Sequence, residues 1–154
     1  MHNKQKADIL VIALSSPILI GVYVEGKLIE TITSEKRSSD VLAEIFQKLM
    51  QRYEFDALYY ANGPGSFMAI KVAYIFLKTL SVTLSVPLYA RDAFYFNGNR
   101  PIKAIGKLHF VKIQDKIETR PFDQTVVNSF SLPKRLDKND FSNDSLPMYV
   151  IGAV

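Results

Sequence analysis

The chain has 154 residues, a length typical of one ordinary domain or two very small ones. Apolar residues make up 48% and charged residues 22%, which is ordinary globular usage and argues against intrinsic disorder. Because there is no cysteine, disulfides, thiolate metal sites and cysteine nucleophiles are excluded, and the composition suits a reducing cytoplasm. The net charge of +4 is a mild bias, without the interleaved cationic and aromatic residues of a dedicated nucleic-acid surface.

The sequence also argues against a membrane protein. No uninterrupted apolar run reaches the ~18 residues that a membrane span needs. The polar, basic start from Met1 to Lys6 is followed by a strand-like stretch with no small-residue cleavage site, so a signal peptide is not expected. We therefore expect a cytoplasmic protein that does not contact a membrane.

The first half of the chain predicts a three-stranded meander followed by alternating helices and strands. Glu25-Gly26 predicts a tight turn, and Ser38, Ser39 and Asp40 offer helix N-cap and first-turn chemistry. The β-β-β-α-β-α-β order indicates an α/β protein with helices on a mixed sheet. The predicted strands are 8–15, 18–24, 27–33, 55–61 and 87–90, and the predicted helices are 38–53 and 66–85.

The second half gives weaker signals and predicts a small β-rich region. Short strands are expected over 101–106, 108–113 and 117–122, with a turn at 114–116. The segment 131–147 is rich in Lys, Asp, Asn, Ser and Pro and predicts a loop, and 148–152 is a final strand candidate. A linker-like run near residue 98 predicts an N-terminal lobe over 1–97 and a reduced C-terminal lobe over 98–154.

Both predicted helices carry more apolar surface than one sheet contact can cover. The second helix has two lysines, Lys71 and Lys78, on a narrow polar stripe, and most of its remaining circumference is apolar. The surplus predicts a protein-binding surface, although the second lobe or the other helix could also cover it. The candidate partner-binding residues are Leu42, Ile45, Phe46, Leu49 and Met50 on the first helix and Val72, Ile75, Thr79 and Val82 on the second.

The strand-to-helix loop Gly63-Pro64-Gly65-Ser66-Phe67 is the most distinctive string in the sequence. Glycines before a helix N-terminus can cradle an anion, but Pro64 removes one amide and no Walker lysine follows. A tight strand-to-helix turn is the favoured interpretation.

This string and its surroundings resemble the TsaB (YeaZ) family, whose characteristic motif is G-x-G-P-G-S-F-T-G-[LIV]-R at the start of a long helix. The residues from Gly63 to Phe67 match it, Val86-Pro87-Leu88 resembles the strand after that helix, and 10–15 lies at the family's first strand. The resemblance covers about the first 95 residues and identifies a shortened, divergent relative.

The resemblance implies an actin-like/Hsp70-like (ribonuclease H-like) lobe with a reduced second lobe. It also implies a non-catalytic scaffold subunit of the machinery that makes N6-threonylcarbamoyladenosine on tRNA. Its partners would be a TsaD-like catalytic subunit, bound through the two helices, and a TsaE-like ATPase in the same complex. A homodimer is expected in the absence of TsaD, and contact with tRNA would be indirect or weak. ATP and metal are expected on the partner subunits and not on this chain.

The chain departs from the family pattern at two places. Ala13 stands where relatives have an Asp that could help to hold Mg²⁺ near a nucleotide, and Met68-Ala69-Ile70-Lys71 replaces Thr-Gly-Leu-Arg. One alternative function is a nucleotide-binding kinase-like domain. Ala13 argues against it, because it replaces the Asp that could help to hold Mg²⁺.

The second alternative is a hydrolase that uses Ser66 or Asp92. It lacks a nucleophile elbow and a histidine metal motif, since His2 and His109 are the only histidines. We therefore expect no catalytic and no metal-binding residues.

Overall fold

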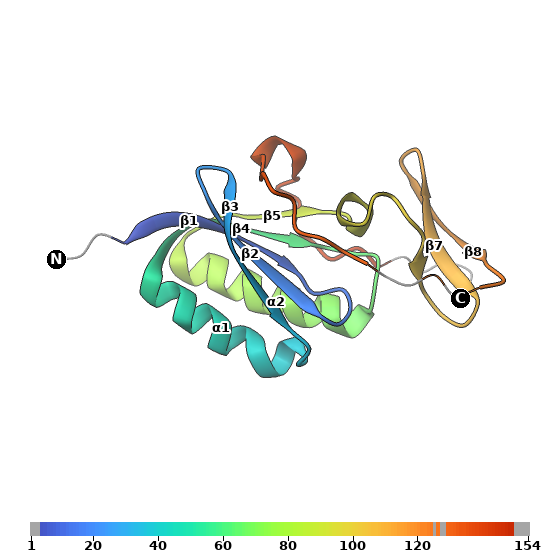
Figure 1. Cartoon of the computed structure of the whole chain (residues 1–154), viewed down its shortest axis with the longest axis horizontal. Coiled ribbons are helices and arrows are strands. Elements are labelled where there is room, and N and C mark those ends of the chain that lie inside the picture. The colour runs from blue at the N-terminus through green and yellow to red at the C-terminus, as the bar shows by residue number, and fades with distance from the viewer. Residues whose placement is uncertain (1–3, 125, 127–128, 150–154) are drawn as a thin grey trace.

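The computed structural model describes residues 4–124, 126 and 129–149. A five-stranded sheet carries both long helices on one face, and a small three-stranded sheet lies at one end of the molecule (Figure 1). The order β3-β2-β1-β4-β5 joins an antiparallel meander to two parallel strands, so the predicted mixed α/β class is confirmed. Its elements are β1 (Gln5–Ile12), β2 (Ile18–Val24), β3 (Lys27–Ser34), α1 (Ser38–Arg52), β4 (Tyr53–Ala61), α2 (Phe67–Leu84) and β5 (Leu88–Arg91).

The central strand β1 is buried on both faces, and successive side chains alternate between two cores. Ile9 and Val11 belong to the core under the helices, where Leu42, Phe46 and Leu49 of α1 pack. On the other face, Leu10 and Ile12 belong to a second core. Apart from Ile70 of α2, this second core is closed by segments after β5, whose members are Ala93, Phe94, Phe96, Ile102, Phe110 and Leu136.

The segment after β5 forms a short 3₁₀ helix, η1 (Ala93–Phe96), and the small sheet of β6 (Ile102–Lys103), β7 (Leu108–Ile113) and β8 (Lys116–Pro121). The β7–β8 hairpin was predicted nearly to the residue. The prediction for 101–106 was too long, since β6 pairs with β7 through two residues before the chain turns at Gly106, where φ is +58°.

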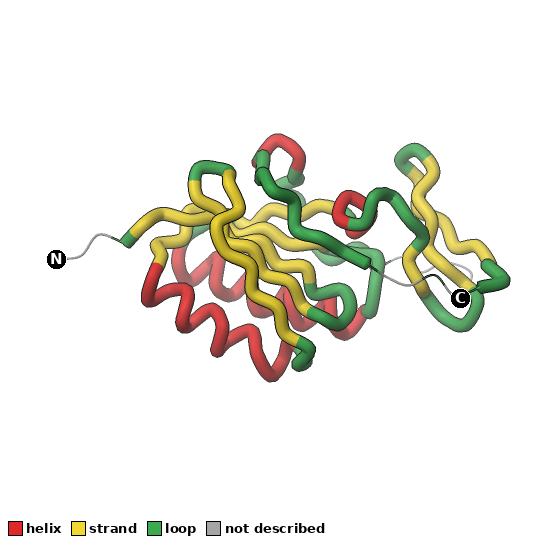
Figure 2. The backbone as a smooth tube through the Cα atoms, viewed as in Figure 1, coloured by secondary structure: helices red, strands yellow, loops and turns green. Residues whose placement is uncertain are grey.

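A returning segment, Ser131–Tyr149, crosses the second face of the large sheet, and we call it the C-terminal strap. It is loop apart from the 3₁₀ turn η2 (Lys138–Asp140), as predicted for 131–147, and it runs on the side of the sheet opposite the two long helices (Figure 2). Backbone hydrogen bonds join it to the β2–β3 turn, to β5 and to the residue after β4. They are Leu28 N to Lys134 O (3.0 Å), Leu136 N to Gly26 O (2.9 Å), Ser142 N to Ala90 O (2.9 Å) and Met148 N to Asn62 O (2.7 Å).

Two buried tyrosines also depend on the strap for hydrogen bonds. The Tyr23 hydroxyl donates to the Pro133 carbonyl oxygen at 2.6 Å, and the Tyr60 hydroxyl donates to the Ser145 carbonyl oxygen. Of the strand predicted over 148–152, Met148 and Tyr149 are not in a strand, and the remainder lies outside the described residues. The proposed lobe boundary near residue 98 stays a prediction.

The helix α1 begins at Ser38, as predicted, but no serine caps it. Arg37 is the N-cap residue and its side chain makes no capping bond, while Ser38, Ser39 and Asp40 are already helical. The Asp40 carboxylate instead pairs with the Arg37 guanidinium at 3.5 Å. By contrast, α2 is capped by Ser66, whose hydroxyl accepts a hydrogen bond from Ala69 N at 3.4 Å.

We predict that Gly63→Ala will destabilise the protein by about 3 kcal/mol or more. Gly63 has φ of +121°, and a Cβ there would collide with the Met148 carbonyl oxygen of the strap. Gly98→Ala is the control, because Gly98 also has positive φ (+70°) but nothing within 4 Å, so it should cost only about 1 kcal/mol. Urea unfolding measures both, and equal losses would contradict close packing of the strap on Gly63.

A pH effect is expected from Asp8 on β1. Burial, and then the nearby Asp56 carboxylate, raise the pKa of Asp8 to about 6, although a backbone hydrogen bond from Ala57 opposes this. A raised pKa in the folded state means that ionising Asp8 costs stability as pH rises from the ordinary range near 4 through 6. Asp8→Asn should therefore raise the unfolding free energy at pH 8 by about 1 kcal/mol, after discounting for solvent screening, with a smaller gain at pH 4.5.

The control is Glu54→Gln, which removes an exposed carboxylate from the neighbouring strand β4. Urea unfolding at both pH values should show little change for this variant. An Asp8→Asn gain that is as large at pH 4.5 as at pH 8 would contradict the raised pKa.

Candidate partner-binding surface

Helix α2 lies on the sheet through a narrow stripe of its circumference. Its buried residues are Ile70, Ala73, Leu77 and Ser81, which recur at helical spacing. At its C-terminal end Ser85 takes the left-handed conformation, with φ of +56°, and its amide donates to carbonyls of the last turn. The sheet therefore covers only one side of a helix that is apolar over most of its girth.

The opposite side of α2 presents large apolar side chains to solvent. Met68 is 68% exposed, Ile75 53% and Val82 68%. These residues lie seven positions apart, two helical turns, so they form one row along the helix. By length and composition α2 could also span a membrane, with a mean hydropathy of 1.6 over 18 residues, although one such helix is weak evidence for a membrane protein. Solvated helix surfaces normally carry polar side chains, so this exposed apolar row is unusual.

An apolar groove of about 460 Å³ runs between α1 and α2 beside this row. Its floor is apolar, and small side chains such as Ala43 and Thr79 line its sides, so a third helix could approach closely. The lining residues are Ser38, Ser39, Leu42, Ala43, Val72, Ile75, Phe76, Thr79, Leu80 and Thr83. The row and the groove together form what we call the helix-layer surface.

The structure separates the predicted partner-binding residues into two groups. Ile75, Thr79 and Val82 are exposed on the helix-layer surface, Val72 lines its groove, and Ile45 and Met50 are half-buried. Three predictions need correction, because periodicity gives the apolar arc of a helix but not the side that meets the sheet. Leu42, Phe46 and Leu49 are each 1% exposed and belong to the core. Of these three, Leu42 also lines the groove.

Sequence reasoning missed Met68 and Ala43 as members of this surface. Met68 was read as a departure from a motif, although its spacing of seven from Ile75 signals the same helix face.

The Gly63–Phe67 loop is a tight strand-to-helix turn, as predicted. The Gly63 carbonyl oxygen accepts a hydrogen bond from Ala93 N at 2.7 Å, and a Cβ on Gly65 would meet Leu14 at 3.2 Å. Phe67 is half exposed and packs edge-on against Tyr149 of the strap, with 5.2 Å between ring centroids. The glycines therefore serve close packing of the β1–β2 turn, η1 and the strap.

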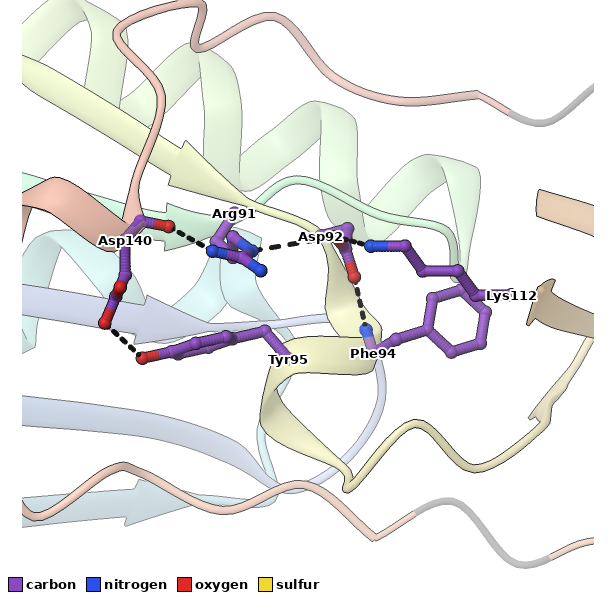
Figure 3. A network of polar contacts seen from close by, with 6 residues as sticks. All are labelled: Arg91, Asp92, Phe94, Tyr95, Lys112 and Asp140. Carbon is purple, nitrogen blue, oxygen red and sulfur yellow. Dashed lines mark hydrogen bonds and ion pairs between the residues drawn. The ribbon is translucent and has the colours of Figure 1, made fainter. Parts of the chain in front are cut away.

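Asp92, a residue of the alternative hydrolase hypothesis, lies at the centre of a polar network (Figure 3). Its carboxylate pairs with Lys112 Nζ of β7 at 2.7 Å and with Arg91 Nε at 3.8 Å, and it accepts a hydrogen bond from Phe94 N at 3.0 Å. Arg91 in turn donates to the Asp140 carbonyl oxygen of the strap. The network joins β5, the small sheet and the strap, which is a structural role.

The other residues of the hydrolase hypothesis also have structural partners. Ser66 caps α2. His109 is buried: its Nδ1 lies 2.9 Å from the Lys107 carbonyl oxygen, and its Nε2 accepts a hydrogen bond from Val126 N at 3.2 Å. In the described part of the chain, no group of three or more Asp, Glu or His side chains could hold a metal ion.

Comparisons with known proteins agree with this geometry. The family model for TsaD, tRNA N6-adenosine threonylcarbamoyltransferase, matches residues 32–91, the segment that contains α1, β4 and α2. YeaZ from Pseudomonas aeruginosa superposes with a TM-score of 0.64 at 13% identity, covering 82% of this chain and 72% of that one.

By its fold, the chain is similar to YeaZ. A second structure, described as an uncharacterized protein with similarity to peptidase YEAZ from Pseudomonas aeruginosa, has a TM-score of 0.59 at 14% identity and covers 80% of this chain and 70% of that one. No curated protein sequence matches the chain. The resemblance inferred from the Gly63–Phe67 string is confirmed, and so is the actin-like fold in a reduced size.

We predict that Asp92 stabilises this TsaB-like fold. Its side chain is 10% exposed, so Asp92→Asn, which keeps an acceptor for Phe94 N but removes the charge opposite Lys112, should cost about 2 kcal/mol. Asp92→Ala should cost about 1 kcal/mol more because the cap is also lost. Chemical denaturation measures both, and two variants as stable as the parent protein would contradict the structural role.

Proposed function

We propose that the chain is a non-catalytic scaffold subunit of the machinery that makes N6-threonylcarbamoyladenosine on tRNA. In this proposal the helix-layer surface binds a TsaD-like catalytic subunit, a TsaE-like ATPase acts in the same complex, and ATP and metal bind to those partners. Contact of tRNA with this chain is indirect or weak, and the protein acts in the cytoplasm.

One observation carries the proposal: Met68, Ile75 and Val82 form an exposed apolar row beside an apolar groove. A row of this kind is unfavourable in water unless another surface covers it. The family match over 32–91 spans the two helices that build this surface, and the fold is that of YeaZ. Asp92 and Ser66, the residues of the hydrolase alternative, each have a structural partner, which supports the scaffold proposal over a hydrolase.

The nucleotide-binding alternative has its own candidate site. A pocket of about 470 Å³ lies between the β1–β2 turn and the starts of both helices, with Ser15, Ser16, Lys36 and Arg37 in its lining. Ala13 is also in the lining, where relatives have a carboxylate, so a magnesium ligand is missing from that position. Calorimetry with ATP and Mg²⁺ tests this alternative, and the scaffold proposal expects no binding to the isolated chain.

The decisive experiment is co-purification with the TsaD-like protein of the same organism. We predict that Ile75→Asp abolishes the complex, because it places a charge at the centre of the apolar row. Since Ile75 is 53% exposed, the variant should fold normally. Phe46→Asp is unsuitable, because Phe46 is buried in the core and the substitution would unfold the protein.

Ile105→Asp is the matched control. Ile105 is 63% exposed but lies beside the small sheet, between β6 and β7, so this variant should keep the complex. Circular dichroism verifies folding of both variants. A parent protein that stays monomeric beside a TsaD-like protein, or an Ile75→Asp protein that still binds with unchanged affinity, would contradict the proposal.

A further inference from the structure

The two helices differ in how their charged side chains are paired. Every charged side chain of α1 has a partner within the chain. The pairs are Asp40 with Arg37 at 3.5 Å, Lys48 with Glu44 at 3.6 Å, and Arg52 with Glu30 at 2.7 Å. Helix α2 carries Lys71 and Lys78 and no acidic residue. Within the described part of the chain, neither lysine forms an ion pair, so the surface has an uncompensated positive charge on one helix.

The two lysines follow one flank of the exposed apolar row. At about 100° per residue, Lys71 and Lys78 project within about 60° of Ile75, on the side of α2 that faces away from the groove. Both side chains are exposed. They are two helical turns apart, which is also the spacing between successive members of the row Met68, Ile75 and Val82. A helix packed along the apolar row would therefore run parallel to a line of two positive charges.

A second copy of this chain would be a poor match for that line. The apolar row is symmetric about Ile75, so two copies of α2 could cross antiparallel about a twofold axis with Ile75 at the centre. In that arrangement Lys71 of each copy would lie opposite Lys78 of the other, because both lysines occupy the same flank. Facing like charges oppose association, so the lysines should weaken, without abolishing, the homodimer that is expected in the absence of a TsaD-like protein.

We propose that the partner presents an apolar helix with acidic side chains two turns apart on one flank, so that the acids pair with Lys71 and Lys78. This inference rests on the proposed function and specifies the chemistry of the partner at the same surface. Flanking charges of this kind select partner and orientation in packed helices. The small side chains Ala43 and Thr79 on the groove side let the partner helix approach, and the lysines fix its register.

The test uses charge reversal at each lysine. Lys71→Glu should weaken binding of the TsaD-like protein on the order of tenfold and, in the absence of that protein, should increase homodimer formation, because Glu at 71 would face Lys78 of the second copy twice. The double variant Lys71→Glu/Lys78→Glu should weaken binding of the TsaD-like protein further and should not dimerise. Titration calorimetry measures the first effect and sedimentation velocity the second.

Lys116→Glu is the control, because it changes the net charge equally but lies at the start of β8, away from α2. Raising the salt concentration should weaken the parent complex and have less effect on the double variant. The charge inference would be overturned if the lysine reversals changed neither the affinity for the TsaD-like protein nor the extent of homodimer formation. If Ile75→Asp still abolished binding in that case, the proposed function would stand. If Ile75→Asp also has no effect, both are overturned.

Discussion

Burial of both faces of β1 and β4 governs the arrangement of the whole molecule. These strands are apolar on each side, as Ile9 and Leu10 illustrate, and a chain of this length supplies long helices for only one face. The other face is closed by η1, the small sheet and the C-terminal strap, which contribute aromatic side chains such as Phe94 and Phe110. Backbone hydrogen bonds from the strap then satisfy groups at the sheet's turns and strand ends that would otherwise be buried without partners.

The same constraint explains why the helix layer is left with apolar surface. Since the sheet needs only a stripe of α2, namely Ile70, Ala73 and Leu77, the remaining girth of that helix meets either α1 or solvent. A helix with no partner beyond this chain would be expected to carry polar residues at positions such as Met68 and Val82. Side chains there contribute nothing to the internal cores, so their character is best explained by an interaction between molecules. In the proposed complex, Lys71 and Lys78 would set the orientation of the partner helix.

Much of the first lobe could be predicted from the sequence because local signals and tertiary structure agree there. The bounds of β2 and the turn at Glu25 and Gly26, both with positive φ, follow from a continuous apolar run and from turn chemistry. The start of α1 at Ser38 was predicted correctly, with Asp40 in the first turn, but the N-cap residue is Arg37, which makes no side-chain capping bond and which composition does not single out.

The candidate surface could be predicted only in part. Helical periodicity found Ile75 and Val82 but gave Leu42 and Phe46 equal weight, because it reports an apolar arc and not its contacts. The role of the strap was hidden for a different reason. Its polar, proline-containing sequence has no period, since it binds the sheet through backbone atoms and through acceptors for Tyr23 and Tyr60. Contacts made by backbone atoms leave no periodic pattern of side chains, so they are visible in the structure and not in the sequence.

The late position of the strap in the sequence has a consequence for biosynthesis. The five strands of the large sheet and both helices lie within residues 5–91, whereas the strap begins at Ser131, so a ribosome completes the sheet well before the segment that shields its second face. During that interval the side chains that pack on the strap, such as Tyr59 against Phe141, lack that cover on the nascent chain, and the apolar row of α2 is exposed as well. Such a translation intermediate exposes apolar surface on both the helix face and the strap face of the sheet. Exposed apolar surface of this kind is what chaperones bind on emerging polypeptides.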